Sequence, residues 1–162
     1  MSANHIISVL VENKAGVLAK ISGLFSRRGF NIESLAVGPT ENEQISRITM
    51  TVNAETHSIE QVVKQLYKLI NVIKIQELDP ANIVERELVL IKVSTENNTR
   101  PEILEIVSIF RANIVDVSKK SLVIEITGTS RKTQALEELL KPYGILELVR
   151  TGKIAINRGI KK

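Results

Sequence analysis

Hydrophobic and polar positions change their spacing along the chain, and these changes mark strands and helices. Residues 6–11 form an apolar, β-branched run, which predicts a strand. From Val17 the apolar positions recur at helical spacing, on a face made of Val17, Leu18, Ile21, Leu24 and Phe25. The next segments are predicted as strands at 31–38 and 45–52, a hairpin loop at 39–43, a helix at 59–70 and a strand at 72–78. The first half therefore has the order β-α-β-β-α-β, which is a ferredoxin-like pattern.

The same order of elements returns after Asp79-Pro80-Ala81-Asn82 interrupts the pattern. Strands are predicted at 88–94, 114–118, 122–127, 145–149 and 154–156. The buried stripe of one helix is Ile103, Ile106, Val107 and Phe110, and the next helix contains Leu136, Leu139 and Leu140. Ser58 with Gln61, and Thr99 with Glu102, predict capping boxes at two helix starts. The two halves share topology rather than residue identity, so they are not a sequence repeat.

These patterns predict an α+β protein with two ferredoxin-like βαββαβ domains in tandem, each an antiparallel sheet with its helices on one face. The predicted domains are residues 1–78 and 84–162, joined by a linker at 79–83. In the strand at 45–52, Arg47, Thr49 and Thr51 alternate with apolar residues, so we expect the sheet face away from the helices to be partly exposed. Edge strands of such sheets are free to pair with a second copy, so we expect a dimer.

Composition indicates a globular protein, because 43% of the 162 residues are hydrophobic and 25% are charged. The chain has no cysteine, which excludes disulfides, thiolate metal sites and a cysteine nucleophile. No apolar run approaches the roughly 18 residues of a membrane span, and the first residues lack the features of a signal peptide. We therefore expect a cytoplasmic protein without a membrane partner.

The net charge of +4 comes from the C-terminal end of the chain. No acidic residue follows position 149, whereas the basic residues there are Arg150, Lys153, Arg158, Lys161 and Lys162. This basic tail is either a solvated end or a contact for an acidic partner. Aromatic residues make up only 3% of the chain, so stacking on nucleic acid is not expected.

The junction between the first strand and the first helix is the candidate binding site. Gly16 lies just before the helix, where the first backbone amides have no partner within the helix and attract a carboxylate. Asn13 adds a side-chain donor and acceptor beside them. Gly29 suits the left-handed position after the helix, and Asn31 opens the next strand. From the residues alone, a simpler interpretation is that these glycines and asparagines only cap a helix and form turns.

No catalytic constellation is evident in the sequence. His5 and His57 are the only histidines, and neither has an acidic neighbour at metal-ligand spacing. The glycines at positions 16, 23 and 29 are too widely spaced for a phosphate-binding loop. The residues therefore predict a binding protein. The alternatives are an effector-binding transcription regulator, for which no DNA-reading helix pair is present, a self-sufficient enzyme of similar fold, and a dimerisation adaptor without a ligand.

Several passages carry a family resemblance that covers essentially the whole chain. They are residues 8–13, 23–35, 84–88, 109–117, 128–130 and 149–155. Together they resemble the small, regulatory subunits of acetohydroxyacid synthase, also called acetolactate synthase.

This resemblance implies that residues 1–78 form an ACT domain, an amino-acid-sensing module that dimerises side by side. The implied partner is a catalytic large subunit that condenses pyruvate with pyruvate or 2-ketobutyrate in branched-chain amino-acid biosynthesis. Thiamine diphosphate, Mg and FAD are expected on that partner, and no cofactor on this chain. The small subunit is expected to raise the activity of its partner and to confer feedback inhibition, usually by valine, with leucine and isoleucine as alternative effectors.

The resemblance also implies an effector site at the opening loop, shared between two chains. One chain supplies Asn13, Ala15, Gly16, Val17 and Leu18, and its neighbour supplies Asn31 and Ile32. The helix amides are expected to take the carboxylate of the amino acid. The Asn13 carboxamide and the carbonyls near Asn31 and Ile32 are expected to take its ammonium. Neither a catalytic residue nor a metal ligand is implied.

Overall fold

The structure is a computed structural model that describes residues 4–53 and 59–159. The chain divides into two compact units, of which one combines Met1–Val84 with Gly152–Lys162 and the other is Glu85–Thr151. The last strand is thus grouped with the first unit, whereas the sequence pattern assigned it to the second domain. Residues 79–83, predicted as a linker, contain a short 3-10 helix and the first residue of a strand.

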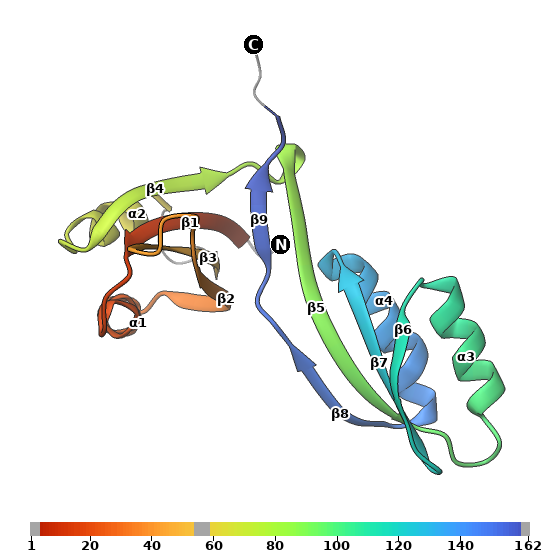
Figure 1. Ribbon diagram of the computed structural model, residues 1–162. Coiled ribbons are helices and arrows are strands. Elements are labelled where there is room, and N and C mark those ends of the chain that lie inside the picture. Colours follow the sequence, from red (N-terminus) through yellow and green to blue (C-terminus); the bar gives the residue numbers. More distant parts are fainter. Residues whose placement is uncertain (1–3, 54–58, 160–162) are drawn as a thin grey trace. The chain divides into compact units, whose positions relative to one another are not determined.

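The first unit has the predicted order of elements (Figure 1). They are β1 (Asn4–Glu12), α1 (Val17–Arg28), β2 (Asn31–Pro39), β3 (Ile45–Asn53), α2 (Ile59–Tyr67) and β4 (Val72–Leu78). The strands form an antiparallel sheet in the order β2-β3-β1-β4, so β2 and β4 are its edges. Both helices cover one face of this sheet over a core that includes Ile7, Val9, Ile21, Phe25, Ile48, Met50, Val62 and Leu66. Burial of such side chains, at roughly 1.5–3 kcal/mol each, is the main force that holds this unit together.

The rest of the chain, most of which forms the second unit, repeats this architecture. After η1 (Pro80–Asn82) come β5 (Ile83–Ser94), α3 (Arg100–Ile109), β6 (Asn113–Val117), β7 (Ser121–Gly128), α4 (Ser130–Leu140), η2 (Lys141–Tyr143), β8 (Ile145–Arg150) and β9 (Ile154–Asn157). The sheet order is β6-β7-β5-β8, and β9 also pairs with β5. The helices pack on a core that includes Val89, Ile91, Ile103, Leu122, Ile124, Ile126 and Leu136. The two units confirm the predicted α+β fold of two ferredoxin-like domains.

Equivalent backbone hydrogen bonds recur in the two units, and their donor residues keep a constant offset along the sequence. The Glu12 amide donates to the Asn71 carbonyl at 2.9 Å, and the Ser94 amide donates to the Gly144 carbonyl at the same distance. The other matching pairs are Asn13 to Gln44 with Thr95 to Lys120, and Phe30 to Phe25 with Ala112 to Val107. Strand bulges also coincide, at Glu33 in β2 and at Val115 in β6. The halves are therefore structural repeats, although the sequence did not identify them as repeats.

The ends of α1 are as predicted, because local chemistry determines them. Gly16 precedes the helix with φ of 85°, and Gly29 follows it with φ of 72°. Both angles are left-handed, which favours glycine. The Gly29 amide donates to the Ser26 carbonyl, and Arg27 and Arg28 occupy the last turn. Cations at this end of a helix interact favourably with its dipole.

Two details of the predicted helices are wrong. Helix α2 ends at Tyr67, and Ile70, placed on its apolar face, is 89% exposed in the turn that follows. Thr99 makes no capping bond, because its hydroxyl donates to the Glu96 carbonyl. The other predicted capping box involves Ser58, which lies outside the described residues.

The sheet face opposite the helices in the first unit is more covered than its sequence predicted. Arg47 is exposed, but Thr49 and Thr51 are only 3% and 7% exposed. Part of the basic tail packs on this face, since the Lys153 amide donates to the Ser34 hydroxyl at 2.8 Å. The tail is therefore not simply a solvated end.

Candidate functional site

The loop between β1 and α1 forms an exposed corner of the first unit. Asn13, Ala15 and Gly16 are exposed, and Leu18 is 41% exposed, whereas Val17 is buried beneath them. The left-handed conformation of Gly16 turns the chain from the strand into the helix. Five of the predicted site residues, Asn13, Ala15, Gly16, Val17 and Leu18, thus lie together at one helix N-terminus.

Backbone amides at this corner are available to a ligand. No described residue accepts a hydrogen bond from the amides of Ala15, Gly16 or Leu18. The Val17 amide makes only a long bond of 3.4 Å to the Lys14 carbonyl. No side chain caps the helix. Unpaired amides at a helix N-terminus, together with the positive end of the helix dipole, bind carboxylates and other anions.

The side chain of Asn13 is held in one orientation by the hairpin between β2 and β3. Its Nδ2 donates to the Glu43 carbonyl at 2.8 Å, and its backbone amide donates to the Gln44 carbonyl at the same distance. Because a carbonyl can only accept, the Asn13 amide nitrogen must point toward the hairpin. No described residue donates to Asn13 Oδ1, so this oxygen is available as an acceptor beside the free amides.

A polar network that the sequence did not reveal supports the corner from below. Asn71, which is 9% exposed, donates from Nδ2 to Glu12 Oε2 at 3.3 Å and accepts from Lys20 Nζ at 3.2 Å. Lys14 pairs with the same Glu12 carboxylate at 2.8 Å. The hydrogen bond from Lys14, followed by that from Asn71, lowers the pKa of the Glu12 carboxyl. The only sequence signal for Asn71 was its place just before a strand.

The other two predicted site residues lie at the opposite end of the sheet. In the strand register, Glu12 is paired with Ile45, whereas Asn31 is paired with Asn53 at the far end of β3. Eight residues of extended strand, at about 3.3 Å each, separate these ends by roughly 26 Å. Asn31 and Ile32 therefore do not join the corner within one chain. A site that includes both groups requires a second chain.

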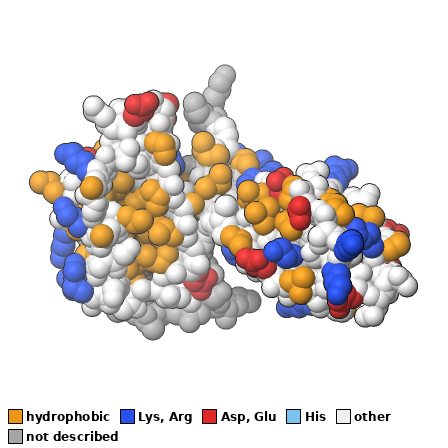
Figure 2. Space-filling view, turned by 60° about the horizontal axis from the view of Figure 1, so that its bottom comes forward, with side chains coloured by type: hydrophobic (Ala, Val, Ile, Leu, Met, Phe, Trp, Pro, Cys, Tyr) orange, Lys and Arg blue, Asp and Glu red, His pale blue; other side chains and the backbone are white. Residues whose placement is uncertain are grey.

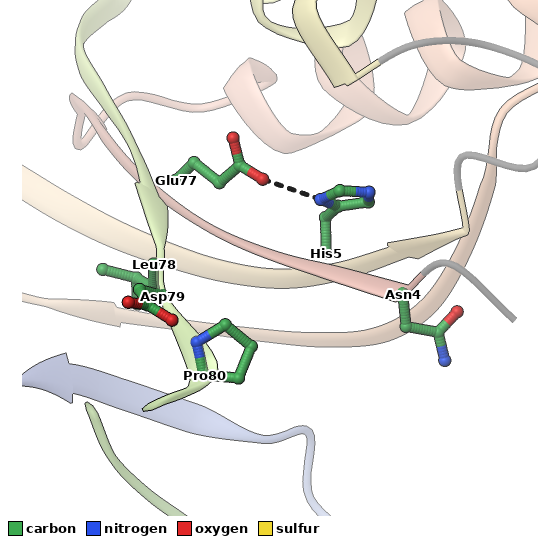
Figure 3. Close-up of a pocket in the computed structure, with 6 residues that line it drawn as sticks. All are labelled: Asn4, His5, Glu77, Leu78, Asp79 and Pro80. Atoms are coloured by element: carbon green, nitrogen blue, oxygen red, sulfur yellow. Dashed lines mark hydrogen bonds and ion pairs between the residues drawn. The ribbon is translucent and has the colours of Figure 1, made fainter. Parts of the chain in front are cut away.

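Two open pockets of the first unit correspond to these two ends. One, of about 570 Å³, lies beside Asn13 and the hairpin at 42–45. The other, of about 480 Å³, lies at the end of β4 near Asn4 and His5 (Figure 3). In this second pocket, His5 Nδ1 and Glu77 Oε1 point toward each other at 2.7 Å. Neither pocket contains all the predicted site residues.

The described residues hold no cluster of three or more potential metal ligands. No helix within 4–53 and 59–159 has the length and apolar character needed to cross a membrane. The first unit is thus a ferredoxin-like domain with an open helix N-terminus at one corner.

Comparisons with known proteins specify the class further. Residues 7–74 match the family described as the AHAS small subunit-like ACT domain, and residues 86–159 match the family described as the small subunit of acetolactate synthase. The chain belongs to the acetolactate synthase small-subunit family.

Relatives with this family name resemble the chain over nearly its whole length. An acetolactate synthase small subunit from Mycolicibacterium smegmatis is 56% identical over 96% of this chain and 91% of its own length. A probable acetolactate synthase small subunit from Archaeoglobus fulgidus is 55% identical over 98% of this chain and 99% of its own. The crystal structure of the acetolactate synthase small subunit from Thermotoga maritima superposes with a TM-score of 0.90 at 44% identity, and covers 98% of this chain and 99% of that one.

Membership of this family defines a regulatory role. The small subunit is the partner of a catalytic large subunit and has no catalytic site of its own. An exposed corner without catalytic groups is consistent with this role.

Proposed function

We propose that this chain senses valine at the corner after β1 and uses it to control the activity of the catalytic subunit. In the absence of valine the chain activates its partner, and with valine bound it inhibits. Leucine and isoleucine are the alternative effectors. The catalytic partner is expected to carry thiamine diphosphate, Mg and FAD.

The chemistry of the corner supports an α-amino acid as the ligand. The amides of Gly16 and Leu18 are free to bind a carboxylate. Asn13 Oδ1 is free to accept from an ammonium group, together with carbonyls near Asn31 and Ile32 of a second chain. A small apolar pocket distinguishes side chains that differ by one methylene by only about 1–3 kcal/mol. We therefore expect valine to be preferred over leucine and isoleucine by a modest factor.

The strand register is the observation that carries the two-chain arrangement. Asn13 and Asn31 lie at opposite ends of the same sheet, so one chain alone cannot form the site. In a two-fold symmetric dimer whose β2 edges meet antiparallel, the Asn31 end of one chain lies beside the Asn13 end of the other.

The surface of the first unit supports such a dimer. Strand β2 is an edge of nine residues, and an uncovered edge of this length is open to pairing with another chain. Val37 on β2 is 47% exposed, and Leu18 on α1 is 41% exposed. Figure 2 shows hydrophobic side chains grouped on one face of this unit, with Lys and Arg side chains along its margin. We propose a homodimer through the ACT domain.

A shared site also supplies a mechanism for inhibition. Valine that bridges two chains favours the dimer arrangement in which both half-sites are closed. Inhibition follows if the catalytic subunit binds the other arrangement more tightly, since a ligand shifts an equilibrium only by its difference in affinity for the two states.

Calorimetric titration of valine into the purified chain tests the sensor. We expect saturable binding of one valine per chain, and at least tenfold weaker binding in an Asn13→Ala variant. Gln134→Ala is the matched control, because it removes an exposed carboxamide from the second unit. If valine binds but the activity of the reconstituted complex is unchanged, the regulatory part of the proposal is wrong.

Mixing two inactive variants tests whether the site is shared. Asn13→Ala and Asn31→Ala chains should each bind valine weakly. After subunit exchange, half of the dimers contain one of each chain, and each mixed dimer has one intact site, so about a quarter of the sites should recover. Absence of recovery after confirmed exchange would place the whole site in one chain.

A further inference from the structure

The C-terminal segment of the chain lies across the open face of the sheet in the first unit. The Lys153 amide donates to Ser34 Oγ on β2 at 2.8 Å. Further along, Ala155 is buried in a small cluster with Ile6 on β1 and Leu78 on β4. The segment therefore contacts both edges of the sheet. We call residues 152–155 the strap.

The strap follows a single row of paired residues. In the register of the sheet, Ser34 is paired with Thr51, Thr51 with Ile6, and Ile6 with Leu78. From Gly152 to Ala155 the extended strap covers about 10 Å. Two strand spacings of about 4.8 Å add up to the same length. This length is the distance from β2 to β1. Thr51, in the middle of the row, is 7% exposed, and its hydroxyl has no hydrogen-bond partner among the described residues.

Gly152 is the point of closest approach between the strap and β2. A Cβ at this position would lie 2.2 Å from the carbonyl oxygen of Leu35 and 3.0 Å from the amide nitrogen of Ala36. Both neighbours are backbone atoms, so any side chain larger than hydrogen must move the strand or the strap. No left-handed φ requires glycine here. The close contact alone explains this glycine.

Strand β2 is held by pairing with β3, by packing of Ile32 and Leu35 on the core, and by the strap. It is an edge strand with β3 as its only neighbour in the sheet, and its register with β3 is interrupted by the bulge at Glu33. The bulge separates Ser34, which the strap contacts, from Ile32 and Asn31, which form the β2 half of the proposed effector site. Because Ser34 directly follows the bulge, a shift of Ser34 and Leu35 is expected to move the adjoining Asn31 and Ile32 as well.

We propose that Gly152 and Ser34 are positioning residues for the effector site, because their contacts fix the part of β2 that presents Asn31 and Ile32. This inference rests on the proposed valine site. The strap thereby connects the C-terminal end of the chain to Asn31 and Ile32, which complete the proposed effector site of the partner chain.

Gly152→Ala and Ser34→Ala test the strap without changing any residue that contacts the effector. Gly159→Ala is the matched control, because a Cβ there has no described atom within 4 Å. We expect calorimetry to show at least tenfold weaker valine binding for Gly152→Ala and a smaller loss for Ser34→Ala, while the control binds as the native chain does. The Ser34→Ala chain should unfold at the same urea midpoint as the native chain and activate the catalytic subunit to the same extent. A general loss of structure would lower both.

Amide NMR spectra of the ligand-free chain test the same inference without valine. Gly152→Ala should shift the resonances of Asn31 and Ile32 and leave those of Gly16 and Leu18 in place. Native valine affinity in both strap variants, or unchanged Asn31 and Ile32 resonances, would overturn the inference. If the native chain itself binds no valine while these resonances do shift, the effector proposal fails and the positioning of β2 by the strap stands.

Discussion

The loop after the first strand differs between the two units, although the backbone hydrogen bonds around it coincide. In both units the amide just before the helix has no acceptor among the described residues, at Gly16 in the first unit and at Asn98 in the second. In the second unit Arg100 occupies the position of Leu18. Its Nη2 donates to the carbonyls of Ser118 and Lys119 at 2.6 and 3.2 Å. One scaffold thus carries an open corner and a corner closed by its own arginine.

The two corners differ in how their hairpin carbonyls are used. In the first unit Asn13 donates hydrogen bonds to the hairpin carbonyls of Glu43 and Gln44. Its side-chain Oδ1 accepts no hydrogen bond from a described residue. In the second unit the equivalent hairpin is bound by a cation from the chain itself, and Asn97 and Asn98 take the left-handed angles, with φ of 61° and 56°. The corner of the first unit leaves the Asn13 oxygen without a donor among the described residues, whereas the corner of the second unit satisfies its hairpin acceptors internally.

Among the variants that test this comparison, Arg100→Ala should change the free energy of unfolding most. We expect Arg100→Ala to lower the free energy of unfolding by about 2 kcal/mol, because three bonds from one charged group to oxygen acceptors are lost. Urea denaturation measures this change. Leu18→Ala is the control at the equivalent position, and should cost less than about 1 kcal/mol, since that side chain is 41% exposed. Equal costs at the two positions would mean that Arg100 does not close its corner.

The residues that follow the two matched helices provide a second, smaller test. Gly29 and Arg111 occupy equivalent positions with φ of 72° and 54°. A left-handed conformation costs a residue with a Cβ about 1 kcal/mol. We expect Arg111→Gly to raise the free energy of unfolding by about 0.5–1 kcal/mol, and Gly29→Ala to lower it by about 1 kcal/mol.

Thermal and urea unfolding of both variants measure these opposite signs. A Cβ at Gly29 has no described atom within 4 Å, so its cost reports backbone strain and not a clash. If Arg111→Gly is neutral or destabilising, the exposed arginine side chain must contribute contacts that offset the strain.

The sequence predicted those parts of the fold that local chemistry determines. The bounds of α1 were predicted correctly because glycines flank the helix and its apolar face is regular. The end of α2 was missed because Leu69 and Ile70 continue the helical period, whereas the turn before Asn71 requires the chain to leave the helix. Thr99 was misassigned because the two left-handed asparagines before it, Asn97 and Asn98, turn its hydroxyl back to the loop.

The candidate site was predictable only in part, for the same reason. The corner at Asn13 and Gly16 is a local feature that the residues predict. The position of Asn31 at the opposite end of the sheet follows from strand register, which spacing along the chain does not give. The contact of Gly152 with Leu35 joins positions far apart in sequence, and no local signal marked it.

The smallest test concerns the link between the first helix of each unit and the turn before its last strand. In the first unit Lys20 donates to Asn71. In the second, the Tyr143 hydroxyl donates to Glu102 Oε2 at 2.8 Å. This hydrogen bond raises the pKa of Tyr143, with smaller contributions from desolvation and from the charges of Glu102 and Glu105.

Because the native pKa of Tyr143 is raised, the contribution of this link to stability is fully present below the ordinary tyrosine pKa of about 10 and is lost as the pH rises through the native value. A Tyr67→Phe background leaves Tyr143 as the one tyrosine, so its ultraviolet titration is unambiguous. Glu102→Gln should lower the Tyr143 pKa toward about 10, and Glu105→Gln should lower it less. If Glu102→Gln and Glu105→Gln lower the Tyr143 pKa equally, charge alone, and not the hydrogen bond, links α3 to this turn. The correspondence with Lys20 and Asn71 would then be one of position only.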